Sequence, residues 1–204
     1  MKNVIITIIL FFFSFSVYSQ TVTLEEFQKI ADLSGLKFEM PKGYKVTKII
    51  KNPDLDYSFA IINADSTMEV RYSIFPLKTK IKEYNDYKNS SNKANDGMIT
   101  AMSDPNKLYW GLSISTMSNL TNGKPTEGND FPKEAVKEEF NADFGTSAMF
   151  KLDCEYGKGY GAANLITLHK EDVADVLIVI LTNIKNGDKY YSEMLIPFHA
   201  LRYN

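Results

Sequence analysis

The sequence predicts an α+β protein in which helices pack on an antiparallel sheet of about six to seven strands. Short apolar segments bounded by turn residues fall into two groups, one between residues 38 and 75 and the other between residues 148 and 183. Segments with helical start and stop signals precede, separate and follow these groups. A sheet built from both groups and covered by the helices accounts for this order.

The first helix is predicted by the capping box Thr23-Leu-Glu-Glu26, where the threonine oxygen accepts from a backbone N–H and Glu26 bonds back to the cap. Gly35 offers the left-handed stop. A short strand at Phe38, a Pro-Gly turn and a second strand running to Ile50 are expected next. The meander is completed by strands at residues 57–62 and 68–75.

The middle of the chain is polar at first and then helical. Residues 78–97 alternate polar and charged side chains with few apolar anchors, which predicts a long surface excursion. Residues 105–121 are predicted as a helix, because Asp104-Pro105 is a start signal and Asn122-Gly123 is a stop signal. An extended conformation remains the alternative, since four apolar side chains alternate there as in a strand: Leu108, Trp110, Leu112 and Ile114.

A further helix is expected after Asp130 and Pro132, with three apolar side chains on one face: Val136, Phe140 and Phe144. Three strands should follow, at residues 148–154, 162–169 and 173–183. The last of them contains the unbroken apolar run Leu177-Ile-Val-Ile-Leu181. Such a run predicts a central strand covered on both faces of the sheet.

The C-terminal segment, residues 188–203, is predicted as a helix kinked at Pro197. Its inward-facing side chains are expected to be Tyr191, Met194, Leu195, Phe198 and Leu201. The alternative is a hairpin, because Asn186-Gly187 is a strong turn signal.

Residues 1–19 have the pattern of an export signal. Lys2 is followed by an apolar run at residues 4–13 and by Val17-Tyr18-Ser19, a passable cleavage site. The run is shorter than the roughly 18 apolar residues of a spanning helix, so a retained anchor is the less favoured alternative. We therefore expect a single domain at residues 20–204, located in the periplasm or outside the cell, with no membrane span after processing.

Composition narrows the possible partners. The net charge of the full chain is −2, and it becomes more negative when Lys2 is removed, which argues against nucleic acid as the partner. The single cysteine, Cys154, excludes an internal disulfide and a lipid anchor after the apolar run. Its acidic neighbours Asp153 and Glu155 disfavour a reactive thiolate.

Few residues are candidates for chemistry. The two histidines are His169, expected in a solvated turn, and His199, expected in the terminal helix. Acid–base catalysis would require them to meet a carboxylate such as Asp143. This is a poor ligand set, so we expect neither a metal nor another cofactor. The segment Gly157-Lys-Gly-Tyr-Gly161 is followed by a strand rather than a helix, which predicts a turn and not a phosphate site.

The order of elements, with Phe38-Glu-Met-Pro-Lys-Gly-Tyr44 leading into the first meander and residues 165–181 leading into the terminal helix, resembles the PsbP-like α/β fold. That family includes a photosystem extrinsic subunit, a Ran-binding nuclear import factor and many exported bacterial proteins. Residues 136–145 and 198–202 also resemble uncharacterised exported bacterial proteins. The resemblance implies a binding or accessory role rather than catalysis.

We therefore expect a non-enzymatic binding or accessory module whose partner is another exported protein or a small ligand. Tyr156 and Tyr160 are the expected contact residues, because they flank the glycine-rich turn, and Trp110 is a candidate interface anchor. One alternative is a metal-free hydrolase or transferase in which Asp143, His169 or His199 converge in a cleft. Another is a carrier of apolar ligands, which would need a cavity lined by aromatic residues and methionines.

Overall fold

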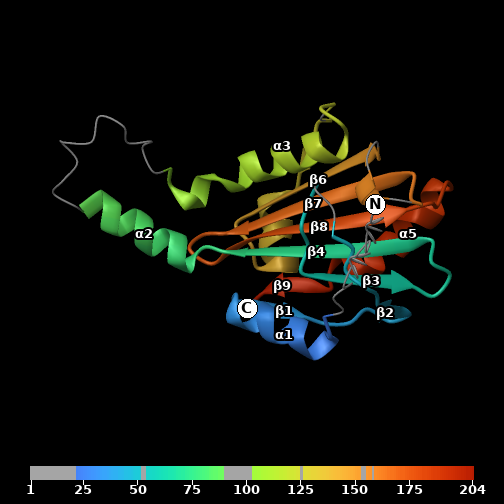
Figure 1. Cartoon of the computed structure of the whole chain (residues 1–204), viewed down its shortest axis with the longest axis horizontal. Coiled ribbons are helices and arrows are strands. Elements are labelled where there is room, and N and C mark those ends of the chain that lie inside the picture. The colour runs from blue at the N-terminus through green and yellow to red at the C-terminus, as the bar shows by residue number, and fades with distance from the viewer. Residues whose placement is uncertain (1–21, 52–53, 90–102, 125, 153–154, 158) are drawn as a thin grey trace, which may run out of the picture.

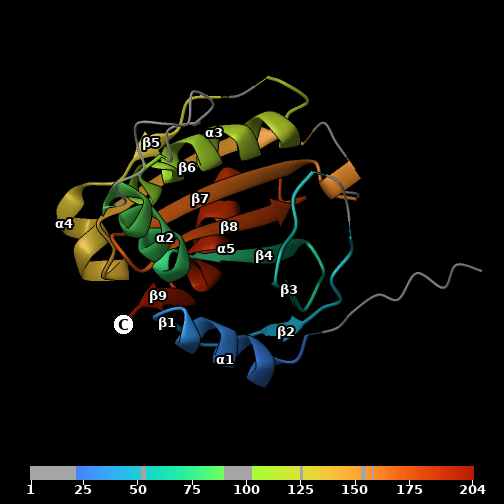
Figure 2. The ribbon, with the colours of Figure 1, turned by 60° about the vertical axis from the view of Figure 1, so that its left-hand side comes forward.

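The computed structural model describes residues 22–204 apart from 52–53, 90–102, 125, 153–154 and 158. The predicted export signal and Cys154 lie outside the described residues. The chain forms a seven-stranded antiparallel sheet, a separate two-stranded ribbon and helices on both faces of the sheet (Figures 1 and 2). The predicted α+β class and the antiparallel sheet are confirmed.

The strands of the sheet lie in the order β2-β3-β4-β8-β7-β6-β5, and β1 pairs with β9 in the ribbon. Their bounds are β1 Leu36–Phe38, β2 Tyr44–Val46, β3 Phe59–Asn63, β4 Met68–Pro76, β5 Asn129–Asp130, β6 Phe144–Lys151, β7 Ala162–Lys170, β8 Ala174–Thr182 and β9 Leu201–Tyr203. Every residue of β8 is buried, and β8 lies between β4 and β7. The predicted central strand is therefore confirmed.

Helices cover the two faces of the sheet unequally. The α-helices are α1 Leu24–Leu33, α2 Lys78–Asn89, α3 Tyr109–Leu120, α4 Lys133–Ala135 and α5 Gly187–Phe198. Single turns are formed at η1 Pro105–Lys107, η2 Val136–Phe140 and η3 Glu155–Gly157. One face, here called the α5 face, is covered by α1, α5, η2 and the β1–β9 ribbon, whereas α3 covers the opposite α3 face.

The core of the α5 face is rich in aromatic side chains. Phe27 of α1 stacks on Phe59 of β3 with ring centroids 4.2 Å apart, and Phe38 meets both Phe59 and Tyr72 edge-on. Offset and edge-to-face ring pairs of this kind add stability beyond the area that they bury. This cluster joins α1 and the ribbon to the sheet.

The predicted start and stop signals of α1 are both confirmed. Thr23 Oγ1 accepts from the backbone N–H of Glu26 at 3.2 Å, and the Glu26 carboxylate accepts from the backbone N–H of Thr23 at 2.8 Å. Gly35 adopts φ +74°, and a Cβ at this position would lie 2.8 Å from Val173 Cγ1. Glycine is therefore required there both by the backbone conformation and by the space available.

Strand pairing differs from the predicted meander in the ribbon. The segments on either side of the Pro-Gly turn do not pair with each other, because β1 pairs with β9 and β2 pairs with β3. The second strand ends at Val46 rather than continuing to Ile50. β9 is a suitable partner for β1 because its side chains alternate between the core and solvent: Leu201 and Tyr203 are buried, while Arg202 is exposed.

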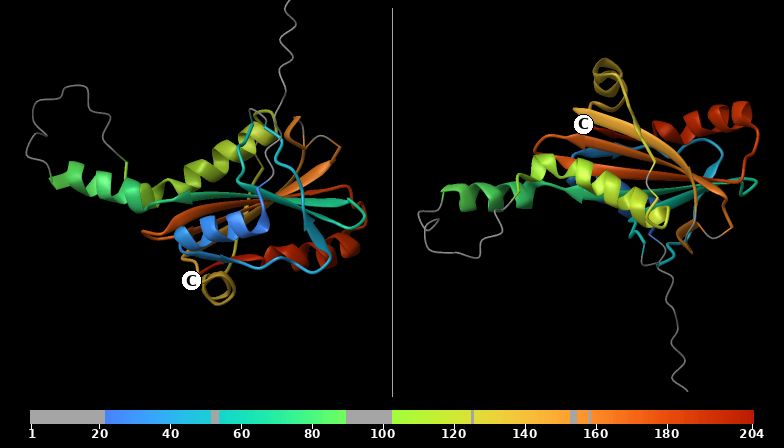
Figure 3. Two further views of the ribbon diagram at one scale, coloured as in Figure 1. Left: turned by 60° about the horizontal axis from the view of Figure 1, so that its bottom comes forward. Right: turned by 90° about the horizontal axis from the view of Figure 1, so that it is seen from above.

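The structure differs from the sequence predictions in two helical segments. Residues 78–89 lie at the surface, as expected, but they form a helix, α2, which buries none of its residues and projects from the sheet (Figure 3). Its lysine and glutamate side chains are good helix formers, so an apolar stripe is not needed for the helical conformation. The helix before β6 ends at Phe140, because Asn141 adopts a left-handed conformation, and Phe144 belongs to β6.

The terminal segment is a helix, as predicted, but only as far as Phe198. Asn186 accepts from the backbone N–H of Lys189 at 3.0 Å and so caps α5, which makes the alternative hairpin wrong. Met194 and Phe198 face the core, whereas Tyr191 and Leu195 are 58% and 56% exposed, contrary to expectation.

We predict that the fold is lost in alkaline solution. Burial raises the pKa of Tyr190 from 10.0 to about 12, and burial holds the pKa values of Tyr72 and Tyr203 well above 10.0. The neutral phenols therefore contribute stability that is complete below pH 10 and is lost as the pH rises toward about 12. Tyrosinate absorbance and circular dichroism, recorded together, should show these tyrosines ionising only as the fold is lost. Complete ionisation near pH 10 in a folded protein would contradict this.

Candidate functional site

His169 of β7 and Asp175 of β8 form a buried pair beneath the start of α3. They face each other across the two strands, and His169 Nδ1 lies 2.7 Å from Asp175 Oδ1. The imidazole stacks on Tyr109 with ring centroids 4.4 Å apart. His169 and Asp175 are only 5% and 3% exposed. The expected solvated turn histidine is therefore wrong, because β7 extends to Lys170 and α3 covers its end.

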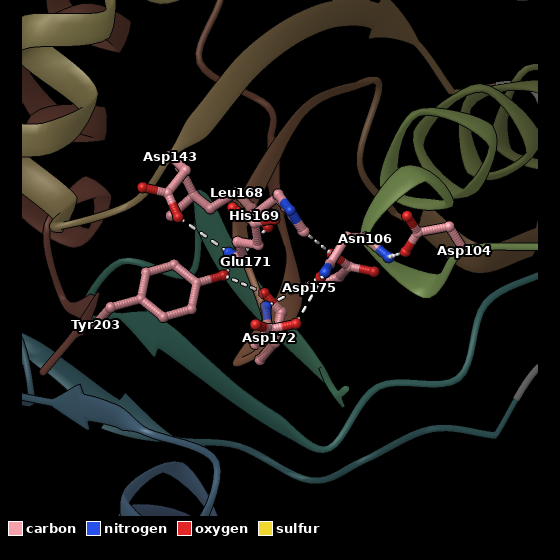
Figure 4. A network of polar contacts seen from close by, with 10 residues as sticks. Asp104, Asn106, Asp143, Leu168, His169, Glu171, Asp172, Asp175 and Tyr203 are labelled. Carbon is pink, nitrogen blue, oxygen red and sulfur yellow. Dashed lines mark hydrogen bonds and ion pairs between the residues drawn. The ribbon is translucent and has the colours of Figure 1, made fainter. Parts of the chain in front are cut away.

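Polar contacts around this pair hold the turn between β7 and β8 in place (Figure 4). Asn106 and Asp172 exchange two hydrogen bonds of 2.9 Å, which tie the turn to η1. Asp143 Oδ2 accepts from the backbone N–H of Glu171 at 3.0 Å, which ties the turn to the segment before β6. The Tyr203 hydroxyl donates to the carbonyl of Ala174 at 2.7 Å. The network joins strands, turn and helix.

The nearest hydroxyl groups on this face are also engaged. Thr167 Oγ1 donates to Ser113 Oγ of α3 at 2.9 Å, and both residues are buried. A serine, a histidine and an aspartate thus lie on one face of the sheet, but under α3 rather than in a cleft. Since a substrate must reach the reacting groups, this arrangement supports the packing of α3 and not catalysis.

His199 forms a second, exposed pair on the opposite face of the sheet. His199 Nε2 lies 2.8 Å from Glu139 Oε2, and the ring stacks on Phe140. Both side chains are about half exposed at the rim of a groove of about 370 Å³ lined by Lys37, Glu39, Glu138, Glu139, His199, Ala200 and Arg202. The described lining contains basic and acidic groups but no serine, threonine or cysteine that could act as a nucleophile.

Arg71 of β4 is buried on the α3 face between two tyrosine rings. Its guanidinium carbon lies 4.8 Å from the ring centroid of Tyr57 and 4.4 Å from that of Tyr156. Arg71 Nε donates to Glu69 Oε1 at 2.6 Å, and the guanidinium also donates to the backbone carbonyl of Tyr156. Cation–π contacts and a charge-assisted hydrogen bond therefore join the segment around η3 to the sheet.

The two tyrosines expected to contact a partner belong to this cluster. Tyr156 is 1% exposed, so in this structure it contributes to the core and offers no contact surface. Tyr160 is partly exposed, and its hydroxyl lies 3.5 Å from Glu69 Oε2. Burial and the nearby Glu69 carboxylate raise the pKa of Tyr160 to about 12. A turn rich in glycine and tyrosine had suggested an exposed loop, but Arg71 draws the first tyrosine inward.

An apolar groove of about 430 Å³ lies beside α3. We call it the α3 groove, and it is lined by Trp110, Ile114, Met117, Thr126, Glu127 and Gly128. Trp110 is 47% exposed, and its ring meets Phe144 edge-on with centroids 6.0 Å apart. Ile114 is exposed on the same helix, and Leu108 is exposed at its N-cap.

A smaller groove of about 240 Å³ lies between α5 and η2 on the α5 face. It is lined mainly by apolar side chains: Phe131, Pro132, Ala135, Val136, Glu139, Phe140 and Phe198. The Phe131 and Phe198 rings meet edge-on with centroids 5.8 Å apart.

The side chains of the predicted chemical residues do not converge in one cleft, although the backbone N–H of Asp143 donates to the carbonyl of His169 at 2.8 Å. His169 pairs with Asp175, His199 pairs with Glu139, and Asp143 contacts Glu171 and Lys137. Among the described residues, no group of three or more His, Cys, Asp and Glu side chains is arranged to hold a metal ion. Within the same residues, no helix has the length and apolar character needed to cross a bilayer.

Sequence reasoning missed Asp175, Glu139 and the pair Glu69–Arg71. One signal was present for the last of these, because Glu69 and Arg71 are spaced two apart in a strand of otherwise mostly apolar residues. That spacing places both side chains on one face of the sheet, where burial requires each to find a partner. Glu139 lies 60 residues from His199, so only the fold reveals that pair. Asp175 lies six residues from His169, and the register of the β7–β8 turn decides that they face each other.

We predict that His169→Ala destabilises the protein by about 3–5 kcal/mol, because it leaves the Asp175 carboxylate buried without its partner. The matched control is His199→Ala, which opens an exposed pair and should cost about 0–1 kcal/mol. Replacing both His169 and Asp175 by leucine should recover most of the loss. Urea denaturation measures all three, and equal losses for the two single histidine variants would refute a structural role for the buried pair.

We predict that Arg71→Lys lowers the free energy of unfolding by about 1–3 kcal/mol, because lysine cannot serve Glu69 and the Tyr156 carbonyl together. Hydrogen exchange of the Tyr156 and Tyr160 amides should become faster than in the unaltered protein. The control Arg202→Lys, on the exposed side of β9, should stay within about 0.5 kcal/mol. Unchanged exchange at Tyr156 in the Arg71 variant would contradict the anchoring role.

Comparisons of the chain with protein-family models, with curated proteins and with solved structures found no match. The PsbP-like resemblance therefore stays a prediction from the sequence pattern.

Proposed function

We propose that this is an exported protein that acts by binding another exported protein through the α3 groove. The observation that carries the proposal is the exposure of Trp110 and Ile114, which lie one helical turn apart on α3 and both line the apolar α3 groove. Contiguous exposed apolar side chains mark interaction surfaces on soluble proteins, and tryptophan is enriched among the residues that dominate binding energy.

The α3 groove has the composition of a protein interface. Apolar side chains from α3 form one wall, and Thr126 and Glu127 provide polar groups at the other. Trp110 is held by Phe144, which is itself packed against Tyr109 with centroids 4.7 Å apart. An anchor held in place before binding loses little conformational entropy in a complex.

The alternatives have weaker support. The His169–Asp175 pair is covered by α3, and the exposed His199–Glu139 pair lies beside charged groups without a nucleophile in the described lining. Both apolar grooves lie at the surface, beside half-exposed side chains, rather than inside the two hydrophobic clusters that fill the core. These features favour binding of a macromolecule over hydrolysis or transport of an apolar ligand.

Export is supported by the pattern of residues 1–19, and the binding role by the resemblance of the element order to the PsbP-like fold. An exported binding protein meets its partners in the periplasm or at the cell surface. The partner is expected to present an apolar or aromatic group that fits beside Trp110.

The proposal is tested by placing a photo-crosslinking amino acid at position 110 in cells that express the protein naturally. We expect a discrete cross-linked partner at this position and none when the same amino acid replaces Glu134, which is exposed on α4. Trp110→Ala should then weaken binding of the purified partner by about 1–3 kcal/mol, as measured by calorimetry.

The matched control for this measurement is Leu33→Ala on α1, which removes an exposed apolar side chain on the other face of the sheet. It should leave the affinity unchanged, and both variants should melt as the unaltered protein does. Equal cross-linking from positions 110 and 134, or an affinity unaffected by Trp110→Ala, would overturn the proposal.

A further inference from the structure

We infer that the outer edge of β6 at residues 148–151, here called the β6 edge, binds an extended segment of another polypeptide as an added strand. This surface adjoins the α3 groove at Gly128, where a Cβ would lie 3.8 Å from Ala148 Cβ. It differs from the groove in using backbone hydrogen bonds rather than a tryptophan anchor.

The β6 edge is left open because β5 is short. β5 pairs only with Thr146 and Ser147 of β6, and the backbone N–H of Phe131 then donates to the carbonyl of Gly145 at 2.9 Å. β6 itself continues to Lys151. Among the described residues, no strand pairs with β6 on this side beyond Ser147.

The register shows which backbone groups point outward. The N–H of Leu152 donates to the carbonyl of Gly161 across the β6–β7 pair, and Gly145 uses its carbonyl on the opposite side. Because alternate residues of an antiparallel strand direct their backbone groups to opposite neighbours, Met149 and Lys151 direct theirs away from β7. Two donors and two acceptors thus line the edge at the spacing of a β-strand.

An apolar ledge flanks the β6 edge on the α5 face. Tyr191, Leu195 and Phe198 follow one another at positions i, i+4 and i+7 of α5, and Phe198 contacts Phe131, which comes directly after β5. This stripe therefore faces the β5–β6 side of the sheet. Met149, which is 47% exposed, faces Asn164 across the strands, and Asn164 donates to Met194 Sδ of α5 at 3.2 Å.

The chemistry of this surface specifies its occupant. Only an extended main chain presents alternating N–H and C=O groups that match those of Met149 and Lys151. Alternate side chains of that segment would lie over Met149, Tyr191 and Leu195, so they should be apolar. The edge carries little of the protection that isolates sheet edges, since Lys151 is its only charged residue and it contains no proline.

The first experiment uses a capped octapeptide of alternating valine and threonine as the probe, added to the full-length protein. We expect saturable binding and slower hydrogen exchange at the Met149 and Lys151 amides by about tenfold or more. The internal control is the opposite edge of the sheet, where β2 directs the backbone groups of Val46 outward, whereas the Tyr44 N–H already donates to the carbonyl of Pro41. Protection of the β2 amides instead, or of neither edge, would overturn the inference.

The second experiment removes one outward donor. In Met149→Pro the missing N–H is not part of the β6–β7 ladder, and proline is tolerated at such edge positions, so the fold should persist. Its affinity for the probe should fall by about tenfold relative to Met149→Ala, which loses the side chain but keeps the donor. Equal affinities for the two variants would refute the use of the backbone edge.

Two further measurements on the unaltered protein test the inference without relying on the folding of the proline variant. A probe that is N-methylated at alternate residues along its pairing edge should not bind, because its backbone can no longer donate there. Sedimentation should show a monomer at the concentrations used. Binding of the methylated probe, or a dimer that protects Met149 without any peptide, would overturn the inference, and the latter would assign the edge to a second copy of the chain.

Discussion

The fold depends on one constraint, which is that β8 is apolar on both faces and must be covered on both. β4 and β7 pair along the whole of β8, so the three long strands form a layer between two separate hydrophobic clusters. Covering the α5 face requires α1, α5, η2 and the ribbon, whereas α3 alone covers much of the other. Burial of apolar surface on both sides is the main source of stability for such a sheet.

The same constraint explains why the buried ionisable side chains occur in pairs. Glu69 and Arg71 of β4, and His169 and Asp175 at the ends of β7 and β8, lie in strands that the helices cover. A charge in such a place must be paired or it destabilises the fold. Each pair is satisfied within the protein, the first by two tyrosine rings and the second by Tyr109 of α3. These side chains are of the types used in catalysis, but here they hold α3 and the η3 segment against the sheet.

The surfaces available for binding lie where the helices and edge strands stop covering the sheet. α3 is half-exposed on its outer side, so Trp110 and Ile114 face solvent, and β5 is too short to protect β6 beyond Ser147. The exposed stripe on α5 follows from the same geometry, because only one side of the helix reaches the sheet. Contacts with other polypeptides can form at these places without disturbing the core, as the proposed binding role requires.

The sequence by itself determined the elements whose signals are local. The capping box set the start of α1, the unbroken apolar run identified β8 as central, and Asp104-Pro105 marked the turn that leads into α3. Only the tertiary structure decided that β1 pairs with β9, that Tyr156 turns inward onto Arg71, and that Tyr109 of α3 covers His169. The physical reason is that capping and alternation act between residues close in sequence, whereas strand pairing and burial depend on which distant segments compete for the same apolar surface.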